Sequence, residues 1–100
     1  MKQARPITVL WTSWHSSEVV SLLRRDNYVG TAFFPDSQDV LGGRSFSVDI
    51  HFVRPPLEQG NPTKGQAFFL SGEGPDGWLA PGTVFELLDG AQVVGIGLVH

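Results

Sequence analysis

Apolar and polar residues alternate most regularly between Ser45 and Phe52. Phe46, Val48, Ile50 and Phe52 fall on one side of this segment, and Ser45, Ser47, Asp49 and His51 fall on the other. Because successive side chains of a strand point to opposite faces, this pattern predicts a strand with one buried and one solvent-facing side. The strand is expected to end before Pro55-Pro56, since proline cannot donate a hydrogen bond to a neighbouring strand.

Other parts of the chain also read as strands, because they are rich in β-branched and aromatic residues and are bounded by turn residues. They are Ile7–Trp11, Tyr28–Phe34, Gln66–Leu70, Thr83–Leu88 and Gln92–Val99. The last two flank Asp89-Gly90, a pair typical of a tight β-hairpin because glycine adopts a positive φ without strain. Short strands separated by turns at these intervals are typical of a small β-barrel or sandwich.

Three segments between the strands have a different character. Residues 54–65 and 71–77 are rich in proline or glycine and are expected to form loops. Residues 17–25 contain Val19, Val20, Leu22 and Leu23. This apolar group fits either a short helix or a loop folded over one end of a barrel, and its period does not separate the two.

Length and composition narrow the class of protein. A chain of 100 residues with 41% apolar and 17% charged residues is expected to fold as a single globular domain over residues 1–100. The sequence has no apolar run long enough to span a membrane and no secretory signal pattern. It also has no cysteine, which excludes disulfides, thiolate catalysis and cysteine-ligated metal sites. A cytoplasmic location is the expectation that fits these features.

The net charge of −3 is unevenly distributed. Residues 55–100 contain Lys64 as their single basic residue, against Glu58, Glu73, Asp76, Glu86 and Asp89. The adjacent basic pair of the chain is Arg24-Arg25. Nucleic-acid-binding proteins usually present a clustered basic surface, because contacts with phosphates supply much of their affinity. RNA binding is therefore the alternative hypothesis and not the leading one.

Candidate catalytic and metal sites are weak. Asp49 and His51 share one face of a strand, but a metal site needs at least three ligands, and nothing places His15 or His100 nearby. Serine, histidine and aspartate all occur, yet no Gly-x-Ser-x-Gly motif holds a strained nucleophile. We therefore expect no enzymatic activity, no bound metal and no cofactor.

Seven residues are candidates for contact with a partner. Trp14, Tyr28 and Trp78 are large aromatics with a polar group, a type enriched at binding hot spots although it also fills cores. Arg24 and Arg25 form either a solvated turn or a contact for an acidic or phosphate group. Gly95 and Gly97 mark either a close approach by a neighbouring segment or a flat backbone patch for a partner. If Val94, Ile96 and Leu98 point into the barrel, these glycines lie on its outer face.

The end of the chain carries a more particular pattern. From Phe68 it reads FFLSGEGPDGWLAPGTVFELLDGAQVVGIGLV, in which the residues of interest are Pro81, Gly82, Phe85, Leu87, Asp89, Gly90, Val94, Gly95, Gly97 and Val99. This pattern resembles the C-terminal (third) β-barrel domain of elongation factor Tu, and more closely the small bacterial proteins that contain only that barrel. The resemblance implies an all-β fold, a six- or seven-stranded antiparallel β-barrel, with a short helix allowed near residues 17–25.

The first two thirds of the chain resemble this family in outline only. Tyr28–Phe34 keeps the tyrosine and the aromatic end of the family's strand, whereas residues 17–25 replace its Gly-Gly-Arg loop. In the full factor that region helps engage transfer RNA, so the resemblance implies the fold more than this role. The chain also lacks a phosphate-binding P-loop, and no GTPase activity is expected.

These observations predict a non-catalytic binding module that docks onto another protein. The alternative is an RNA-binding protein with a translation-related role, which would use Arg24, Arg25, Tyr28 and Arg44. Self-association is a further expectation if the barrel has a free edge near the final hairpin. No membrane partner is expected.

Overall fold

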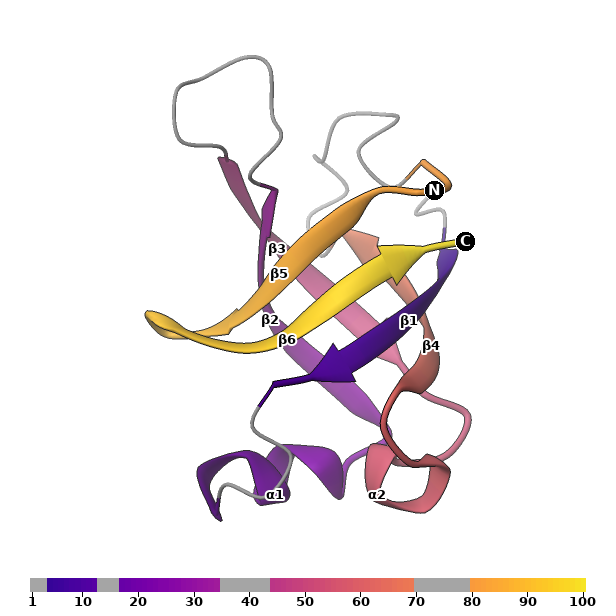
Figure 1. The fold of residues 1–100 in the computed structure, drawn as a ribbon, viewed down its shortest axis with the longest axis vertical. Coiled ribbons are helices and arrows are strands. Elements are labelled where there is room, and N and C mark those ends of the chain that lie inside the picture. The colour runs from indigo at the N-terminus through magenta and orange to yellow at the C-terminus, as the bar shows by residue number, and fades with distance from the viewer. Residues whose placement is uncertain (1–3, 13–16, 35–43, 70–79) are drawn as a thin grey trace.

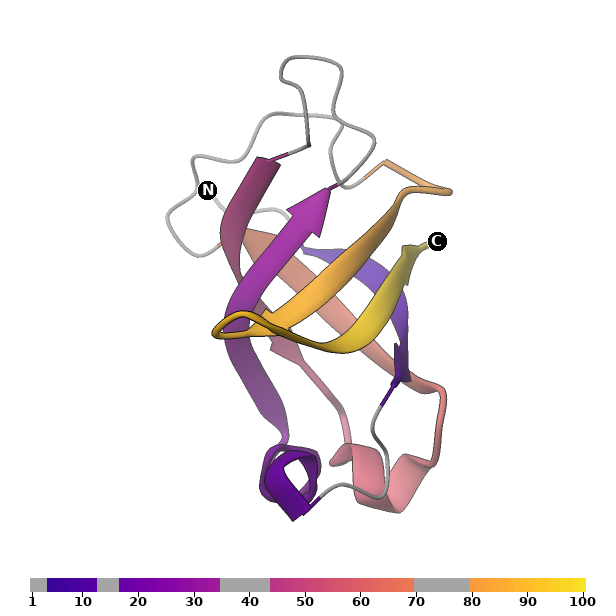
Figure 2. The same ribbon diagram turned by 60° about the vertical axis from the view of Figure 1, so that its left-hand side comes forward.

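Six antiparallel strands close into a barrel in the order β1-β4-β3-β2-β5-β6 (Figure 1). The computed structural model describes residues 4–12, 17–34, 44–69 and 80–100. The strands are β1 (Arg5–Trp11), β2 (Asn27–Phe34), β3 (Arg44–His51), β4 (Thr63–Phe69), β5 (Val84–Asp89) and β6 (Gln92–Val99). Two short helices, α1 (Ser17–Leu23) and α2 (Pro56–Gln59), lie together at one end, which we call the helix end (Figures 1 and 2). The predicted antiparallel barrel is confirmed, with six strands.

The two helices lie in one segment whose structure the sequence leaves open and in one that it predicts to be a loop. Residues 17–23 form a helix that also covers the barrel end, because Val19 and Leu23 lie one turn apart and are both buried. Residues 54–65 are not a continuous loop as predicted. Pro55 precedes the single helical turn of α2. The backbone amides of Glu58 and Gln59 donate hydrogen bonds to the Pro55 carbonyl. Proline suits the start of a helix, since its fixed φ is helical and its missing N–H is not needed there.

The interior of the barrel follows the alternation of its strands. In β3, Val48 and Ile50 are fully buried while Ser45, Ser47 and His51 are exposed, as the sequence predicts. The same alternation in the other strands places a continuous core inside the barrel, which includes Ile7, Val9, Trp11, Tyr28, Ala32, Phe34, Ala67, Phe85, Leu87 and Val99.

Glycines in three strands face inward and leave room for aromatic rings. A Cβ atom at Gly97 would lie 2.4 Å from Cζ of Phe85, and one at Gly30 would lie 2.6 Å from the ring of Tyr28. At Gly65 the same atom would lie 2.8 Å from the ring of Phe52. The diameter of a barrel falls with the number of its strands, so a six-stranded barrel has little interior space. The rings of Phe85, Tyr28 and Phe52 therefore fit beside strand positions that have no side chain.

The orientation of β6 excludes the possibility that Val94, Ile96 and Leu98 all point into the barrel. Gly95 and Gly97 point inward, and Ile96 and Leu98 point outward. The pairing of β5 with β6 shifts here, because Leu87 pairs with Gly95 while Leu88 pairs with Val93. This bulge leaves Val94 unpaired, so that it and Gly95 are both buried. The alternative reading of the glycines, close approach by a neighbouring segment, agrees with the structure.

Hydrogen bonds join Trp11, at the end of β1, to residues 61 and 63 at the helix end. Its indole N–H donates to the hydroxyl of the fully buried Thr63 at 3.0 Å, and that hydroxyl donates to the Gly60 carbonyl at 2.7 Å. The side-chain amide of Asn61 bonds both backbone groups of Trp11, at 2.9 and 3.1 Å. Since β4 begins only at Thr63, Asn61 takes the place of a strand partner for the end of β1.

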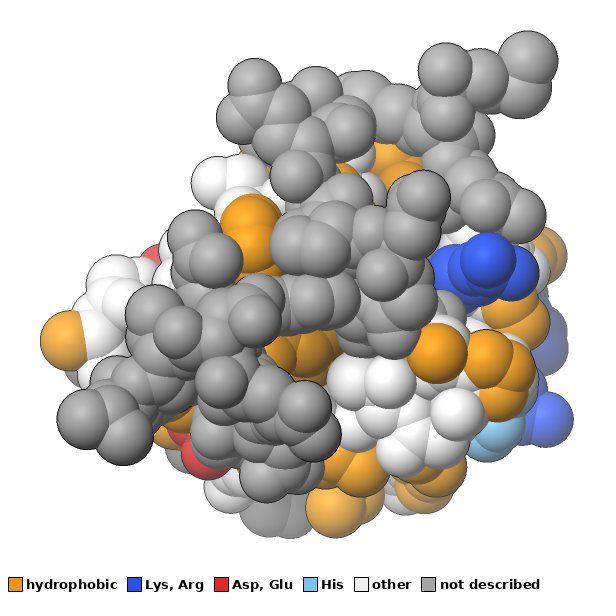
Figure 3. Space-filling model, turned by 90° about the horizontal axis from the view of Figure 1, so that it is seen from above, with side chains coloured by type: hydrophobic (Ala, Val, Ile, Leu, Met, Phe, Trp, Pro, Cys, Tyr) orange, Lys and Arg blue, Asp and Glu red, His pale blue; other side chains and the backbone are white. Residues whose placement is uncertain are grey.

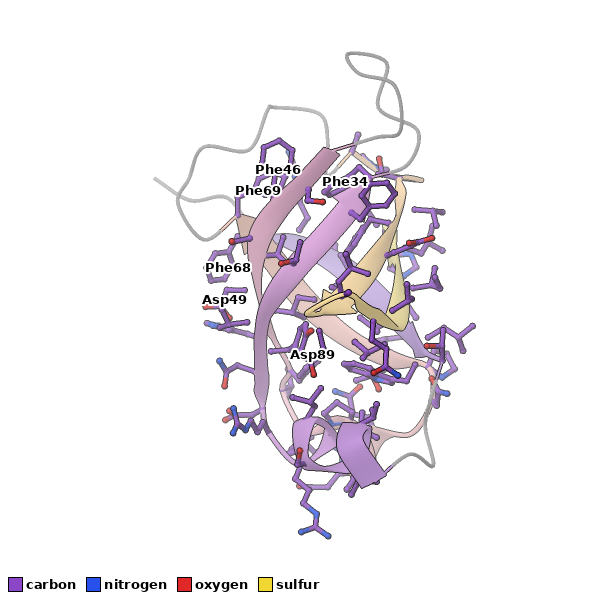
Figure 4. The ribbon with its side chains drawn as sticks, turned by 90° about the vertical axis from the view of Figure 1, so that its left-hand side faces the viewer. Phe34, Phe46, Asp49, Phe68, Phe69 and Asp89 are labelled. Carbon is purple, nitrogen blue, oxygen red and sulfur yellow. The ribbon has the colours of Figure 1, made fainter. Side chains whose placement is uncertain are left out.

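A cluster of phenylalanines fills the opposite end of the barrel. Phe34 lies 5.3 Å from Phe85 and 6.2 Å from Phe69, measured between ring centroids, and Phe46 lies 5.4 Å from Phe69. Phe34, Phe46 and Phe69 lie close together where their strands meet (Figure 4). We call this the phenylalanine end. Tilted and edge-on ring pairs of this kind stabilise a core beyond the area that they bury.

We predict that Gly97→Ala destabilises the protein by about 1 to 3 kcal/mol, because the added methyl group overlaps the Phe85 ring. Urea unfolding followed by tryptophan fluorescence measures this change. The double variant Gly97→Ala/Phe85→Leu should be more stable than the sum of the two single changes indicates, since the smaller side chain relieves the overlap.

Leu98→Ala is the matched control on the outer face of the same strand, and its effect should stay below about 1 kcal/mol. Additive effects of Gly97→Ala and Phe85→Leu would contradict the proposed contact between them.

Candidate protein-binding surface

The structure brings few of the seven predicted contact residues to the surface. Arg24 and Arg25 are exposed, in the turn that follows α1. Trp14 and Trp78 lie outside the described residues. Gly95 and Gly97 face the interior, which corrects the interpretation of a flat glycine patch, because the space beside them belongs to Val9, Trp11 and Phe85.

Tyr28 also belongs to the interior. Only 4% of its surface is exposed, and its ring packs edge-on against Trp11, with 6.1 Å between the ring centroids. The phenol donates a hydrogen bond of 2.8 Å to the carbonyl of Leu88. Both the ring and the hydroxyl group are thus used within the barrel, and this corrects the interpretation of Tyr28 as a surface contact.

The residues of the RNA-binding hypothesis do not come together. Arg44 begins β3 and pairs with Phe34 at the phenylalanine end. Arg24 and Arg25 precede Asn27, which pairs with His51 at the other end of the same two strands. Arg44 and His51 are separated by the length of β3, about 23 Å of extended chain. The backbone of Arg44 therefore lies at the opposite end of the β2–β3 pair from Arg24 and Arg25.

Asp49 and His51 lie together on the outer face of β3, as their spacing predicts. Their Oδ2 and Nε2 atoms are 3.1 Å apart, and the His51 ring meets Phe68 edge-on at 5.1 Å. Asp49 and Phe68 project from the same side of the barrel (Figure 4). Within the described ranges, no group of three or more His, Cys, Asp or Glu residues is placed to hold a metal ion.

A larger feature is the outer face of β1, β6 and β5, which carries Leu10, Val84, Ile96 and Leu98. Leu10, Val84 and Leu98 are 51%, 46% and 40% exposed. We call this group the apolar sheet face. The three strands lie side by side toward the viewer in Figure 1, and hydrophobic side chains are visible along part of the lower margin of Figure 3.

The pairing of the strands makes this face continuous. Leu98 pairs with Thr8 on one side and with Val84 on the other, while Ile96 pairs with Leu10 and Glu86. Directly opposed residues of antiparallel strands have Cβ atoms about 5 Å apart, so Leu98 lies beside Val84 and Ile96 lies beside Leu10. The polar residues Thr8 and Glu86 occupy opposite corners, and the Thr8 hydroxyl bonds the imidazole of His100.

Sequence reasoning missed this face, although its residues belong to the segments that it identified. The alternation with Gly95 and Gly97 allows Ile96 and Leu98 to point into the barrel, and in that case they would not lie on its surface. Phe85 is the signal in the sequence that favours the observed orientation. Its large ring needs space inside a narrow barrel, and an inward-facing glycine on the neighbouring strand provides that space. Thr8 and Pro6, which alternate with Ile7 and Val9, also mark the outer face of β1, on which Leu10 lies.

In the part of the chain that the structure describes, neither helix has the length and apolar character needed to cross a membrane. Comparison with protein-family models, with curated proteins and with solved structures finds no match to this chain. The resemblance to the third domain of elongation factor Tu therefore stays a prediction.

The pKa of Tyr28 gives a direct test of its position. Burial raises this pKa to about 12, and the nearby Asp89 carboxylate adds to the rise. Tyr28 is the only tyrosine in the chain, so tyrosinate absorbance reports this residue alone. We expect a titration midpoint near 12 in the folded protein and one about 2 units lower in urea.

The same shift makes stability depend on pH in a defined direction. A raised pKa favours the neutral phenol in the folded state, so this stabilisation is complete below about pH 10 and is lost as the pH rises toward 12. At about pH 11 the loss should reach about 1 kcal/mol. The variant Tyr28→Phe should not show this loss of stability at high pH. At neutral pH it should be about 1 kcal/mol less stable than the wild type, because it lacks the hydrogen bond to the Leu88 carbonyl. A midpoint near 10 in the folded protein would contradict the burial of the phenol.

Proposed function

We propose that this protein is a non-catalytic module that docks onto another protein through the apolar sheet face. The observation that carries the proposal is the exposure of Leu10, Val84 and Leu98 on adjacent strands. Large contiguous apolar patches on a protein surface mark interaction sites, and adjacent exposed side chains are the start of such a patch. Single exposed apolar residues would not carry the same argument, because they are normal on any surface.

The architecture beneath this face favours binding. β6 pairs with β1 along Gly95–Val99 and with β5 along Gly95–Leu98, so the face rests on three hydrogen-bonded strands. Inside, the Phe85 ring fills the space beside Gly97 and fixes the spacing of these strands. A surface that keeps its shape loses little conformational freedom when a partner binds, which leaves more of the burial energy for affinity.

The size of the face indicates how it is used. Specific interfaces bury about 800 Å² on each partner, which is more than four side chains can supply. The apolar sheet face would therefore form the centre of an interface, with polar neighbours such as Thr8, Glu86 and His100 at its rim. This division into an apolar centre and a polar rim is typical of protein–protein contacts.

The likeness of residues 68–99 to elongation factor Tu supports the same function by analogy. In that factor such barrels serve mostly as docking surfaces, and we propose that this chain shares the family and its docking role, without a GTPase or transfer-RNA role. A cytoplasmic location is part of the proposal and rests on the absence of cysteine. The RNA-binding alternative receives less support, since Tyr28 is buried and Arg44 lies far from Arg24.

The test is affinity capture from the host lysate with the tagged wild-type protein and the variant Leu10→Ser/Leu98→Ser. We expect a nearly stoichiometric protein partner that resists nuclease and whose affinity falls at least about tenfold in the variant, because two central apolar contacts are lost. Val29→Ser is the matched control, since Val29 is 53% exposed but lies on β2, outside the apolar sheet face.

A partner retained equally by both variants would exclude the apolar sheet face as its site. Capture that disappears with nuclease would favour RNA binding instead. If the captured protein is a second copy of the chain, sedimentation of the wild type and the double variant would show whether this face joins the copies.

A further inference from the structure

A second surface, at the helix end, brings together arginines that are distant in the sequence. Arg24 and Arg25 follow α1, and Arg54 follows β3; all three are exposed. The β2–β3 ladder, in which Asn27 pairs with His51, is extended by a 2.7 Å hydrogen bond from the amide of Phe52 to the carbonyl of Asp26. The two segments therefore leave the barrel side by side. We call these three residues the arginine cluster.

The backbone beneath the cluster is held by specific hydrogen bonds. The amide of Arg25 donates to the carbonyl of Leu22 at 3.3 Å, which closes the turn after α1. The carbonyl of Arg54 accepts a bond of 2.7 Å from the side chain of Gln59, which also bonds the backbone of Lys64. The arginines thus project from fixed positions, and a ligand would have to order only their side chains.

The guanidinium groups are available for a ligand. The ion pair found among the described residues joins Asp49 and His51, and none there involves Arg24, Arg25 or Arg54. Among the side chains that the structure describes in the turn after α1 and in residues 52–59, Asp26 and Glu58 are the exposed acidic ones, so the three arginines exceed them by one charge although the chain as a whole is negative. An arginine binds a carboxylate or a phosphate through two parallel hydrogen bonds.

The neighbours of the cluster favour a peptide over a nucleic acid. Val53, beside Arg54, is 95% exposed, and Leu57 on α2 is 42% exposed. Among the residues that the structure describes at this end, the rings of Trp11, Tyr28 and Phe52 are buried, whereas single-stranded nucleic acids bind largely by stacking on exposed rings. Carboxylates interspersed with aliphatic side chains match this surface better than phosphates and bases do.

From these observations we propose that Arg24, Arg25 and Arg54 form a binding site for an acidic, aliphatic-containing peptide segment of a partner protein. The arginines bind its carboxylates, and Val53 contacts its apolar side chains. This site goes beyond the docking function proposed above and lies on a different surface from the apolar sheet face. Its failure would leave that function unaffected.

Fluorescence anisotropy with a labelled synthetic peptide tests the proposal. The peptide alternates Glu with Leu and Ser, and the comparison probes are the same peptide with Gln in place of Glu and an oligouridylate of equal charge. We expect the acidic peptide to bind most tightly. Arg54→Gln and the double variant Arg24→Gln/Arg25→Gln should each weaken its binding about tenfold, because each removes charge-assisted hydrogen bonds.

Lys64→Gln is the matched control, since it removes one exposed positive charge near the start of β4, and it should change the affinity by less than about twofold. An equal loss in Lys64→Gln and Arg54→Gln would overturn the site in favour of general charge attraction. Equal or tighter binding of the oligouridylate, or no binding of the acidic peptide, would also overturn it.

Val53→Ser tests the apolar part of the proposal separately. Because this change keeps every charge, it should weaken the acidic peptide about threefold and leave the salt dependence of binding unchanged. Unchanged affinity in Val53→Ser would overturn the role of Val53. All of these residues are exposed, so unfolding curves of the variants should match that of the wild type within about 0.5 kcal/mol.

Discussion

The barrel depends on contacts between large aromatic rings and strand positions that carry no side chain. Phe85 lies against Gly97, Tyr28 against Gly30 and Phe52 against Gly65, and each Cβ added at these glycines would overlap the ring or its surroundings. Glycine weakens an isolated strand, because it loses more conformational freedom than other residues. In this barrel the loss is offset by the apolar area of the rings that the glycines admit to the core.

This interior arrangement decides which side chains are left for binding. Since Gly95 and Gly97 face inward, Ile96 and Leu98 must face outward and join Leu10 and Val84 on the apolar sheet face. Closure of the barrel also gives β6 a partner on both sides, so the final hairpin has no free edge along Gly95–Val99 for the strand pairing expected from the sequence. Contacts with a partner through this hairpin would therefore use side chains.

The two ends of the barrel differ in chemistry. The phenylalanine end is closed by rings from β2, β3, β4 and β5. The helix end combines the buried hydrogen bonds of Trp11, Thr63 and Asn61 with the exposed arginine cluster. Thr63 bonds the Gly60 carbonyl, and the neighbouring Gln59 bonds the Arg54 carbonyl. The hydrogen bonds that stabilise this end therefore also hold the backbone that carries Arg54.

The sequence by itself determined the strands, the hairpin turn and the buried face of β3, because these depend on alternation and turn residues that are local in the chain. The tertiary structure decided the orientation of β6, where the bulge at Val94 and the bulk of Phe85 override the local alternation. It also decided that Tyr28 is buried and that Arg54, not Arg44, joins Arg24 and Arg25. Both outcomes depend on strand register, which arises from packing between segments distant in sequence.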